Sequence, residues 1–394
     1  MSNWRKERLE NLCSKIGDGL HGTPSYSESN DVFFINGNNL KNGRIEVTPN
    51  TKRVSNEELK KGYIPLNENT LLLSINGTLG SMAFYNNEKV MLGKSSAYLN
   101  FKSGINKFYY YYFQLPRVQQ YFYNVATGST IKNLSLKSIQ DFEVPVPDSN
   151  EWQSISKVLS TLDSKIEVNN RINSELEAMA KTLYDYWFVQ FDFPDKKGKP
   201  YKSSGGKMIW NVDLKREIPE GWKVNELSMT ANITNGKLDS SAEVLGAIYP
   251  FYTCASEPST TDSYAFDDNV ILIAGNNASG NFHINRHKGK FNAYQRTYIV
   301  TAKNKNELEY LYQVLKTETK LLKSQGKGSQ TKFLTIGMLT GIKLFANNSV
   351  IDDFNALVSP MYEHQLINRL QNQKLSELRD WILPMLMNGQ VKVK

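Results

Sequence analysis

The sequence predicts an α+β protein in which two pseudo-two-fold-related mixed α/β domains are joined by two long helices that form an antiparallel coiled coil. Three observations predict this fold. Many residues recur after two hundred positions, two long segments follow a heptad repeat, and short apolar runs between Gly- and Asn-rich loops have the length of strands. A chain of 394 residues is long enough for two such domains.

The internal repeat consists of identical residues at one constant spacing. The pairs are Gly80 and Gly280, Tyr98 and Tyr298, Asn106 and Asn306, Tyr110 and Tyr310, Tyr112 and Tyr312, Leu115 and Leu315, Gly128 and Gly328, Ser129 and Ser329, Lys132 and Lys332, and Leu134 and Leu334. This period is far longer than a solenoid unit, so each copy should be a complete domain with its own core. The chain is therefore a tandem duplication.

Each copy ends in a helical segment with a heptad seam. The first seam, within residues 151–190, comprises Ile155, Leu159, Leu162, Ile166, Asn169, Asn173, Leu176, Ala180, Leu183 and Trp187. The second, within residues 349–394, is one residue out of step with the repeat and comprises Phe354, Val358, Met361, Gln365, Asn368, Asn372, Leu375 and Ile382. A seam sustained over several heptads is typical of a coiled coil, so each helix should be the partner of the other.

Both seams contain a pair of asparagines. Asn in a seam lowers stability but fixes the register, because its amide must find a polar group on the facing helix. With a pseudo-two-fold axis the helices run antiparallel, and Asn169 should face Asn372 while Asn173 faces Asn368. The alternative is that these positions are solvated and lie outside the seam. Pro360 should delay the start of the second helix or kink it.

Strands and loops dominate the rest of each copy. Strands are expected at residues 32–35, 70–75 and 97–101, and the last two are echoed at 270–274 and 297–301. Helices with an aromatic face are expected at residues 107–124 and 307–324. Their repeated tyrosines favour a core position over a base-stacking platform, whereas the loops differ between the copies. Recognition should therefore depend on the loops.

Composition points to an anionic partner, with nucleic acid the first candidate, because the net charge is +8 and the pI is about 9.1. The chain opens without a charged-then-apolar leader and its longest apolar runs are strand-sized, so we expect a cytoplasmic protein with no membrane association. Cys13 and Cys254 lie in unlike contexts, which favours neither a disulfide framework nor a thiolate metal site.

The motifs of a self-sufficient enzyme are missing from the sequence. Residues 326–329 (GKGS) lack the upstream glycine of a phosphate loop, and no Asn/Asp-Pro-Pro-aromatic segment of an amino-methyltransferase is present. His283 and His287 have an i, i+4 spacing but appear in a Gly/Asn-rich loop without a third ligand. The acidic pattern of a nuclease begins at Asp148 and Asp195 without being completed, so a nuclease stays a weaker alternative.

Several short motifs follow one another in a recognisable order. They are WRKERLENL (4–12), DGLHGTP (18–24), INGNNLKNG (35–43), GSTIKNLS (128–135) leading into VPVP (144–147), WFVQFDF (187–193), IPEGW (218–222) and LRDWILPMLMNG (378–389). In this order, and over its whole length, the chain resembles the specificity subunit of Type I restriction-modification systems.

The resemblance implies two target-recognition domains, at residues 1–150 and 218–348, a central spacer helix at 151–190, a linker at 191–217 and a C-terminal spacer helix at 349–394. Each domain would read one half of a split site in double-stranded DNA. The helices would set the spacing and seat two methyltransferase subunits, which use S-adenosylmethionine to methylate adenine N6, and restriction subunits would join them. The chain itself would bind no cofactor or metal and perform no catalysis.

The length of the helices fits this arrangement. A helix of about 38 residues, at roughly 1.5 Å per residue, is about 55 Å long, which exceeds the turn of DNA, roughly 34 Å, between half-site centres. Because one helix leads away from the first domain and the other returns, the chain ends should lie close together. The lysine-rich residues 195–216 favour a solvated linker. A two-headed coiled-coil adaptor that binds proteins through the same loops is the alternative function.

Flexible polar side chains on loops are the candidates for DNA contact, since Arg and Lys favour guanine and Asn and Gln favour adenine. In the first domain they are His21, Thr23, Asn76, Thr78, Lys94, Ser95, Thr130 and Lys132; in the second they are Lys237, Asn276, Asn277, Ser279, Gln295, Arg296, Lys327, Gln330 and Lys332. Each single candidate is equally consistent with an ordinary exposed loop residue. Lys132 and Lys332 recur in both copies, which favours contact with phosphate, because phosphate carries the same charge at every site.

Overall fold

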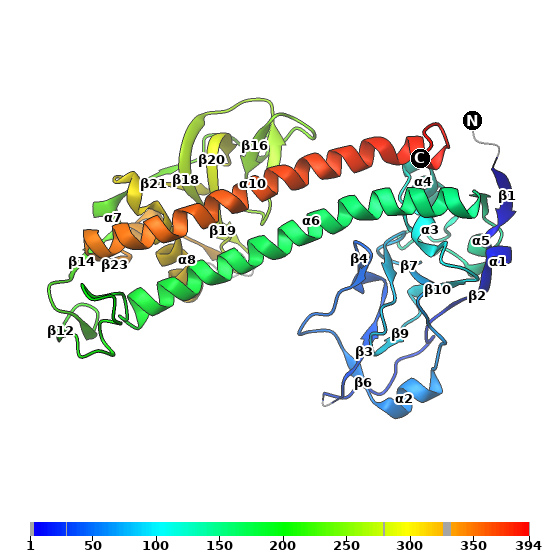
Figure 1. Ribbon diagram of the computed structural model, residues 1–394, viewed down its shortest axis with the longest axis horizontal. Coiled ribbons are helices and arrows are strands. Elements are labelled where there is room, and N and C mark those ends of the chain that lie inside the picture. The colour runs from blue at the N-terminus through cyan, green and yellow to red at the C-terminus, as the bar shows by residue number, and fades with distance from the viewer. Residues whose placement is uncertain (1–3, 29, 279, 326–331, 394) are drawn as a thin grey trace. The chain divides into compact units, whose positions relative to one another are not determined.

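Two long helices run through the protein, and each is shared between two structural units (Figure 1). The structure is a computed structural model that describes residues 4–28, 30–278, 280–325 and 332–393. Unit 1 comprises residues 1–168 and 370–394, and unit 2 comprises residues 169–369. Each unit therefore contains one of the repeated domains and one segment of both helices.

The long helices are α6 (Ser149–Tyr184), which is followed by a π-helical turn (Asp185–Val189), and α10 (Asn348–Met387). Every seam residue expected from the heptads is buried or half-buried, which confirms the seam. Pro360 lies inside α10, so the expected delay in the start of this helix is wrong. Val358 and Tyr362 are buried on either side of it, and their packing holds the helix through the proline.

In unit 2 the helices pack antiparallel. Asn368 Nδ2 donates to Asn173 Oδ1 over 2.9 Å, as the sequence predicts, and the solvated alternative is wrong for this pair. The rings of Trp187 and Phe354 are 5.9 Å apart. Trp187 follows Asn173 in the first helical segment, whereas Phe354 precedes Asn368 in α10, so the two segments run in opposite directions.

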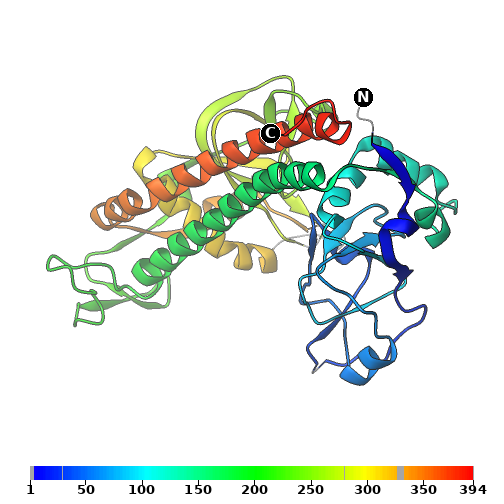
Figure 2. The same cartoon turned by 45° about the vertical axis from the view of Figure 1, so that its right-hand side comes forward.

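Unit 1 contains the other halves of α6 and α10, side by side in both views (Figure 2). Arg379 Nη1 donates to Asp163 Oδ1 over 2.7 Å, and Asn372 Nδ2 lies 3.5 Å from the carbonyl oxygen of Ile166. These contacts also follow an antiparallel order. Asn169 and Asn372 belong to different units, and their pairing stays a prediction.

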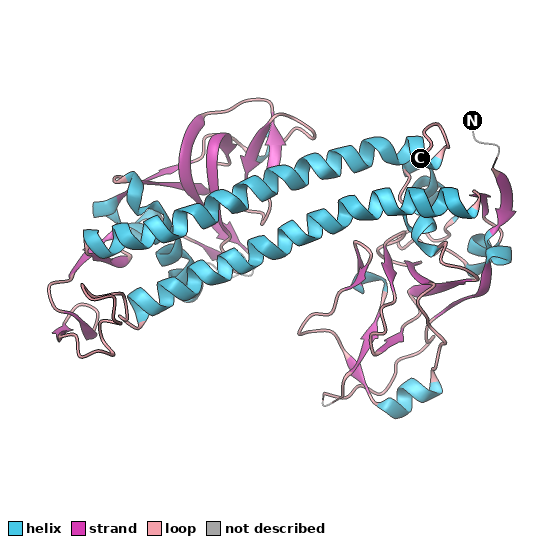
Figure 3. Cartoon of the chain, in the orientation of Figure 1, coloured by secondary structure: helices cyan, strands magenta, loops and turns pink. Residues whose placement is uncertain are grey.

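Unit 1 is built mainly from short strands (Figure 3). The strands are β1 (Arg5–Arg8), β2 (Cys13–Asp18), β3 (Val32–Ile35), β4 (Leu40–Lys41), β5 (Arg44–Ile45), β6 (Arg53–Val54), β7 (Thr70–Ser74), β8 (Met82–Phe84), β9 (Val90–Leu92), β10 (Ser96–Phe101) and β11 (Glu143–Val146). The helices are α1 (Leu9–Leu12), α2 (Asn56–Lys61), α3 (Asn106–Phe113), α4 (Pro116–Val125) and α5 (Leu136–Gln140). The principal sheet has the order β2-β10-β7-β8, and β1 pairs with β11.

Unit 2 repeats this plan with longer strands. The strands are β12 (Met208–Asn211), β13 (Arg216–Pro219), β14 (Lys223–Glu226), β15 (Ala231–Asn235), β16 (Tyr249–Tyr252), β17 (Ser259–Thr261), β18 (Phe266–Ala274), β19 (Asn276–Asn277), β20 (Ile284–Ala293), β21 (Thr297–Ala302), β22 (Lys332–Phe333) and β23 (Lys343–Ala346). The helices are α7 (Leu227–Thr230), α8 (Leu308–Gln325) and α9 (Ile336–Thr340). The principal sheet has the order β15-β21-β18-β20-β16-β17, and β14 pairs with β23.

The topology confirms the duplication. The strands β15, β21, β18 and β20 occupy the places that β2, β10, β7 and β8 occupy in unit 1, and in both units the strand that opens the domain pairs with the one that precedes a long helix. Because the opening and closing strands pair, both ends of a domain meet at its helix. In unit 1 the ends of the described chain meet there too, since Trp4 and Val393 pack against one core cluster, as expected.

The aromatic helices cover the sheets and contribute to the cores. Tyr110, Tyr112, Tyr310 and Tyr312 are all at most 9% exposed, which confirms their predicted core position. The single helix expected at residues 107–124 is wrong, since α3 ends at Phe113 and α4 begins at Pro116. Proline favours the first turn of a helix and has no N–H to continue α3, so the chain turns there.

The segment between α6 and the second domain is more ordered than a solvated linker. Phe191 and Phe193 are buried in the core of unit 2, and Asp192 accepts hydrogen bonds from the backbone and hydroxyl of Ser203. Strands β12 and β13 then form a hairpin. The lysines of the segment are exposed, as expected, but its aromatic residues anchor it.

Two smaller expectations concern cysteines and membranes. Cys13 is buried, which raises the pKa of its thiol to about 12, and Cys254 is half-buried; both are free thiols. Within the described residues no helix is both long and apolar enough to cross a bilayer.

The buried asparagine pair yields a stability prediction. Asn173→Ala leaves the amide of Asn368, which is 4% exposed, without its acceptor, and should lower the free energy of unfolding by about 1–3 kcal/mol. Urea denaturation followed by circular dichroism measures the change. Ser174→Ala, at an exposed position of the same helix, is the control and should leave the midpoint unchanged. Equal midpoints for the two variants would contradict a buried pair.

Candidate nucleic-acid interface

In unit 1, the loop after β2 is held against the turn that joins β9 to β10. Leu20 N donates to the carbonyl oxygen of Leu92 over 2.8 Å. A Cβ at Gly19 would lie 2.2 Å from the same carbonyl oxygen, so only glycine permits this approach. The contact places His21 and Thr23 beside the turn that carries Lys94 and Ser95.

Two further loops join this turn. Ile75 N donates to Ser95 O over 3.0 Å, Leu134 N donates to Ile75 O over 2.9 Å, and Asn76 forms a bridge with Asn133. The eight candidates of unit 1, named above, therefore lie on four loops at one end of the β2-β10-β7-β8 sheet. We call these four loops, residues 18–24, 75–81, 93–95 and 127–134, loop cluster 1.

The candidates of loop cluster 1 differ in what they can offer to a ligand. His21, Thr23, Thr78, Lys94 and Thr130 are exposed, whereas Asn76, Ser95 and Lys132 are half-buried. The Ser95 hydroxyl donates to Asn36 Oδ1 over 3.0 Å and accepts from Gly37 N over 2.9 Å, so it holds two segments together. The Thr78 hydroxyl lies 3.0 Å from that of Ser74.

Unit 2 brings the equivalent loops together. Gly236 N donates to Thr297 O over 3.0 Å, and Gln295 N donates to Leu238 O over 2.9 Å. Gly275 N donates to Arg296 O over 2.8 Å. Loop cluster 2 consists of residues 236–239, 275–278, 294–296 and 332–334.

The second cluster contains the described candidates of unit 2. Strand β19 pairs with β22, so that Asn277 lies opposite Lys332. Lys237, Gln295 and Arg296 are exposed, and Asn276, Asn277 and Lys332 are half-buried. Ser279, Lys327 and Gln330 lie outside the described residues.

Several cations of the clusters lie over or beside other groups. Lys132 Nζ lies 5.0 Å from the ring centroid of Tyr123, and Lys237 Nζ lies 5.3 Å from that of Phe266. Lys332 Nζ donates to the carbonyl oxygen of Lys323 over 3.3 Å. Both clusters offer amides and cations, and loop cluster 1 also offers hydroxyls; these are the groups that contact phosphates and base edges.

Each cluster contains one carboxylate that was not among the candidates predicted from the sequence. Asp18 Oδ2 lies 2.6 Å from His21 Nε2, and Asp239 Oδ2 accepts from Gln295 Nε2 over 3.3 Å. Each carboxylate restrains the orientation of a candidate side chain. The Asp18 signal was visible, since it precedes His21 by three residues in the same motif, whereas Asp239 and Gln295 are distant in sequence.

Of the two histidines with i, i+4 spacing, His283 lies in a loop as expected, whereas His287 does not. His287 belongs to β20, where alternating residues share a face, and its Nδ1 lies 3.0 Å from the Tyr252 hydroxyl. Burial lowers the pKa of His287, so its ring is neutral near pH 7. No cluster of three His, Cys, Asp or Glu side chains in the described ranges could hold a metal ion.

The comparisons with known proteins agree with this duplicated architecture. The family described as Type I restriction modification DNA specificity domain matches residues 1–178 and 219–344, which is one match per repeated domain. The chain belongs to this family of Type I specificity subunits. The resemblance found in the sequence is therefore confirmed.

Individual members of the family match this chain over nearly their whole length. The MjaIX specificity subunit of Methanocaldococcus jannaschii is 24% identical, over 100% of this chain and 94% of its own. The HindI specificity subunit of Haemophilus influenzae is 22% identical, over 99% of this chain and 100% of its own. The crystal structure of a Type I S subunit from M. genitalium has a TM-score of 0.61 at 19% identity, covering 98% of this chain and 96% of that one, so the fold is shared.

The glycines of this specificity subunit give a test of loop cluster 1. Gly19→Ala should force the loop of residues 18–24 away from Leu92, whereas Gly22→Ala, in the same loop, meets nothing within 4 Å. Amide hydrogen exchange should accelerate at Leu20 in the first variant and stay at the wild-type rate in the second. If both variants exchange like the wild type, the close approach at Gly19 does not hold the cluster together.

Proposed function

We propose that this specificity subunit reads a split DNA site, with loop cluster 1 contacting one half and loop cluster 2 the other. The observation that carries the proposal is the repetition of one sheet whose end bears four converging polar loops in each unit. The scaffold recurs while most of the candidate loop side chains differ, which fits two half-sites of unlike sequence. The net charge of +8 favours a polyanionic partner.

Catalysis in this proposal belongs to partner subunits. Two methyltransferase subunits would bind S-adenosylmethionine and methylate adenine N6, and restriction subunits would associate with the same complex. This chain would contribute binding, orientation and spacing. The seam supports the spacing role, since a buried asparagine pair such as Asn173 with Asn368 restricts the register of the helices.

The outer faces of the long helices are the proposed seats of the methyltransferase subunits. In unit 1, the α10 residues Leu370, Leu378 and Trp381 are exposed, and in unit 2, Met179 on α6 and Ile367 on α10 are exposed. Met179 and Leu378 occupy equivalent places in the two copies. Large apolar side chains exposed at matching places on two helices support the docking of two copies of one partner.

Methylome sequencing tests the proposed function directly. The chain is expressed with a candidate methyltransferase subunit from the same genome, and a strain that lacks only this chain is the control. Expected is a split motif with adenine N6 methylation that disappears in the control. If no methylated motif depends on the chain although the partner is present, DNA reading is wrong and the two-headed adaptor replaces it.

Substitutions in the two loop clusters distinguish side chains that recognise bases from side chains that contact the phosphate backbone of DNA. Lys132→Ala and Lys332→Ala should each weaken binding of the complex to all DNA sequences and reduce the slope of log K against log salt by about 1, because one phosphate contact is lost. Fluorescence anisotropy with cognate and unrelated duplexes at several salt concentrations measures both quantities. Lys199→Ala, at an exposed position outside both clusters, is the control. A loss of sequence preference with unchanged affinity would instead assign these lysines to base reading.

A further inference from the structure

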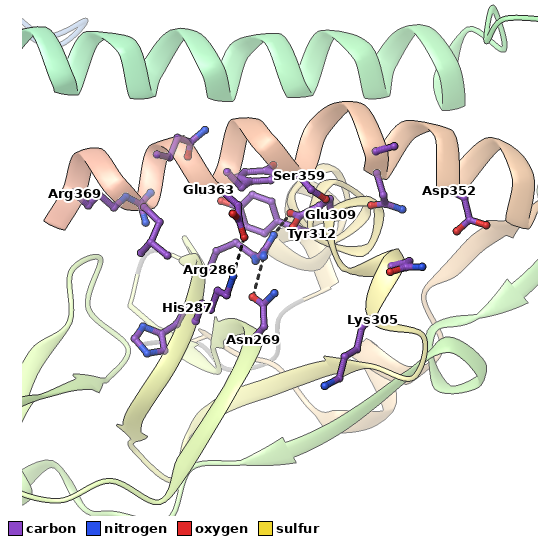
Figure 4. Close-up of a pocket in the computed structure, with 17 residues that line it drawn as sticks. Asn269, Arg286, His287, Lys305, Glu309, Tyr312, Asp352, Ser359, Glu363 and Arg369 are labelled. Carbon is purple, nitrogen blue, oxygen red and sulfur yellow. Dashed lines mark hydrogen bonds and ion pairs between the residues drawn. The ribbon is translucent and has the colours of Figure 1, made fainter. Parts of the chain in front are cut away.

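Unit 2 contains a cavity of about 380 Å³ that none of the predicted DNA-contacting residues lines. Its walls come from strands β18 and β20, from the start of α8 and the turn before it, and from the first half of α10 (Figure 4). A volume of this size is in the range of pockets that hold small organic molecules.

Arg286 is the central charged group of this cavity. Its guanidinium reaches from β20 to form an ion pair with Glu309, and its Nη2 donates to Asn269 Oδ1 over 3.0 Å (Figure 4). The guanidinium also lies over the ring of Tyr362, 5.1 Å from the centroid. Its Nε is buried and has no acceptor in the described part of the protein.

Gln365 supplies a second buried donor without an acceptor. This seam residue of α10 lines the cavity and is 4% exposed, and its Nε2 has no partner among the described residues. A buried amide without a partner costs free energy, which an apolar residue of similar size would avoid. The equivalent seam residue of the other copy is apolar, namely Ile166.

The other walls of the cavity also differ from their counterparts in the first copy of the repeat. Where the second copy has Glu309, Tyr362 and Arg369, the first copy has Tyr109, Asp163 and Asn170. The cavity is therefore not part of the scaffold that the two domains share. A feature of one copy alone points to a role that the duplicated function does not require.

The charges of the lining favour an anion. Four cations, Arg286, Lys288, Lys305 and Arg369, accompany three carboxylates, Glu309, Asp352 and Glu363. Two of the carboxylates are neutralised, since Arg286 pairs with Glu309 and Lys288 Nζ lies 2.8 Å from Glu363. Among the described residues, Lys305 and Arg369 form no ion pair.

We propose that this cavity binds a small organic anion, whose carboxylate or phosphate oxygens accept hydrogen bonds from Gln365 and Arg286 and whose body fills the remaining volume. Lys305 and Arg369 would add attraction at the exposed side of the cavity. An oxyanion would satisfy the donors that the protein leaves without acceptors.

The test uses the full chain, purified with its methyltransferase partner, and isothermal titration calorimetry with phenyl phosphate and with benzoate at constant ionic strength. At least one probe should bind with a Kd below about 1 mM. Gln365→Ile, which installs the residue of the other copy, should weaken that binding about tenfold or more, and Lys305→Ala should weaken it severalfold. Gln373→Ile, at an exposed position of α10, should bind like the wild type.

Several outcomes would overturn the proposal. Neither probe binding to the wild type, or both binding equally to Gln365→Ile, would show that the cavity is no anion site. A thermal melt distinguishes loss of the site from loss of the fold, because Gln365→Ile removes an unpaired buried amide and should melt no lower than the wild type. If a short DNA duplex displaces the probe and Gln365→Ile weakens DNA binding as strongly, the acceptor is a DNA phosphate and not a small molecule.

Discussion

The attachment of each domain to the long helices is the constraint on which the rest of the structure depends. In unit 1, the Tyr111 hydroxyl of α3 donates to Asp163 of α6 over 2.7 Å, and Asp163 also accepts from Arg379 of α10. One carboxylate thus joins three helices. Since these groups are partly buried, each depends on the others for its partner, and the domain has one orientation on the helices in which all of them are satisfied.

Unit 2 meets the same requirement with different side chains. Tyr310 N of α8 donates to Asn355 Oδ1 of α10 over 2.9 Å, and Gln313 Nε2 donates to the Tyr362 hydroxyl over 2.6 Å. Tyr110 and Tyr112 of α3 recur as Tyr310 and Tyr312 of α8, whereas Tyr111 corresponds to Leu311, and its partner Asp163 corresponds to Tyr362. The duplication has therefore kept the apolar contact and exchanged the hydrogen bonds that orient it. Because the sheets rest on α3 and α8, this attachment also sets the direction of the loop clusters.

The parts of the fold that follow a period were predictable from the sequence. The heptad spacing predicted both long helices, and the antiparallel arrangement predicted the pairing of Asn173 with Asn368. The break between α3 and α4 was not predicted, because the aromatic residues of α3 continue in the sequence beyond Pro116 and were assigned to one helix. Phe191 and Phe193 were missed because they adjoin a lysine- and glycine-rich segment, whose composition hides two residues that anchor it in the core.

The site was predictable only as a set of loops, because its assembly depends on contacts between distant residues. Nothing local indicates that Asn76 bridges to Asn133, or that Asp239 accepts a hydrogen bond from Gln295. The sequence features that did indicate the site were its glycines and its repeated residues. These features predict where the backbone of the loops turns, but they do not predict which side chains contact a ligand.

In the two loop clusters, the backbone contacts that hold the loops together are similar, whereas the side chains that the loops present mostly differ. Gly19 and Gly236 both permit a close approach of the chain after the first strand of the principal sheet, β2 or β15, with a Cβ at either position lying 2.2 Å from a backbone oxygen. Beside them, a carboxylate restrains histidine in one copy and glutamine in the other. The positions that bring the loops together are thus shared, whereas the side chains presented on them differ, except for Lys132 with Lys332 and Asn76 with Asn276. A duplicated protein under selection to read two unlike sequences would diverge in this way, because a change in the backbone contacts would disrupt the loops, whereas a change in the exposed side chains alters only what they contact.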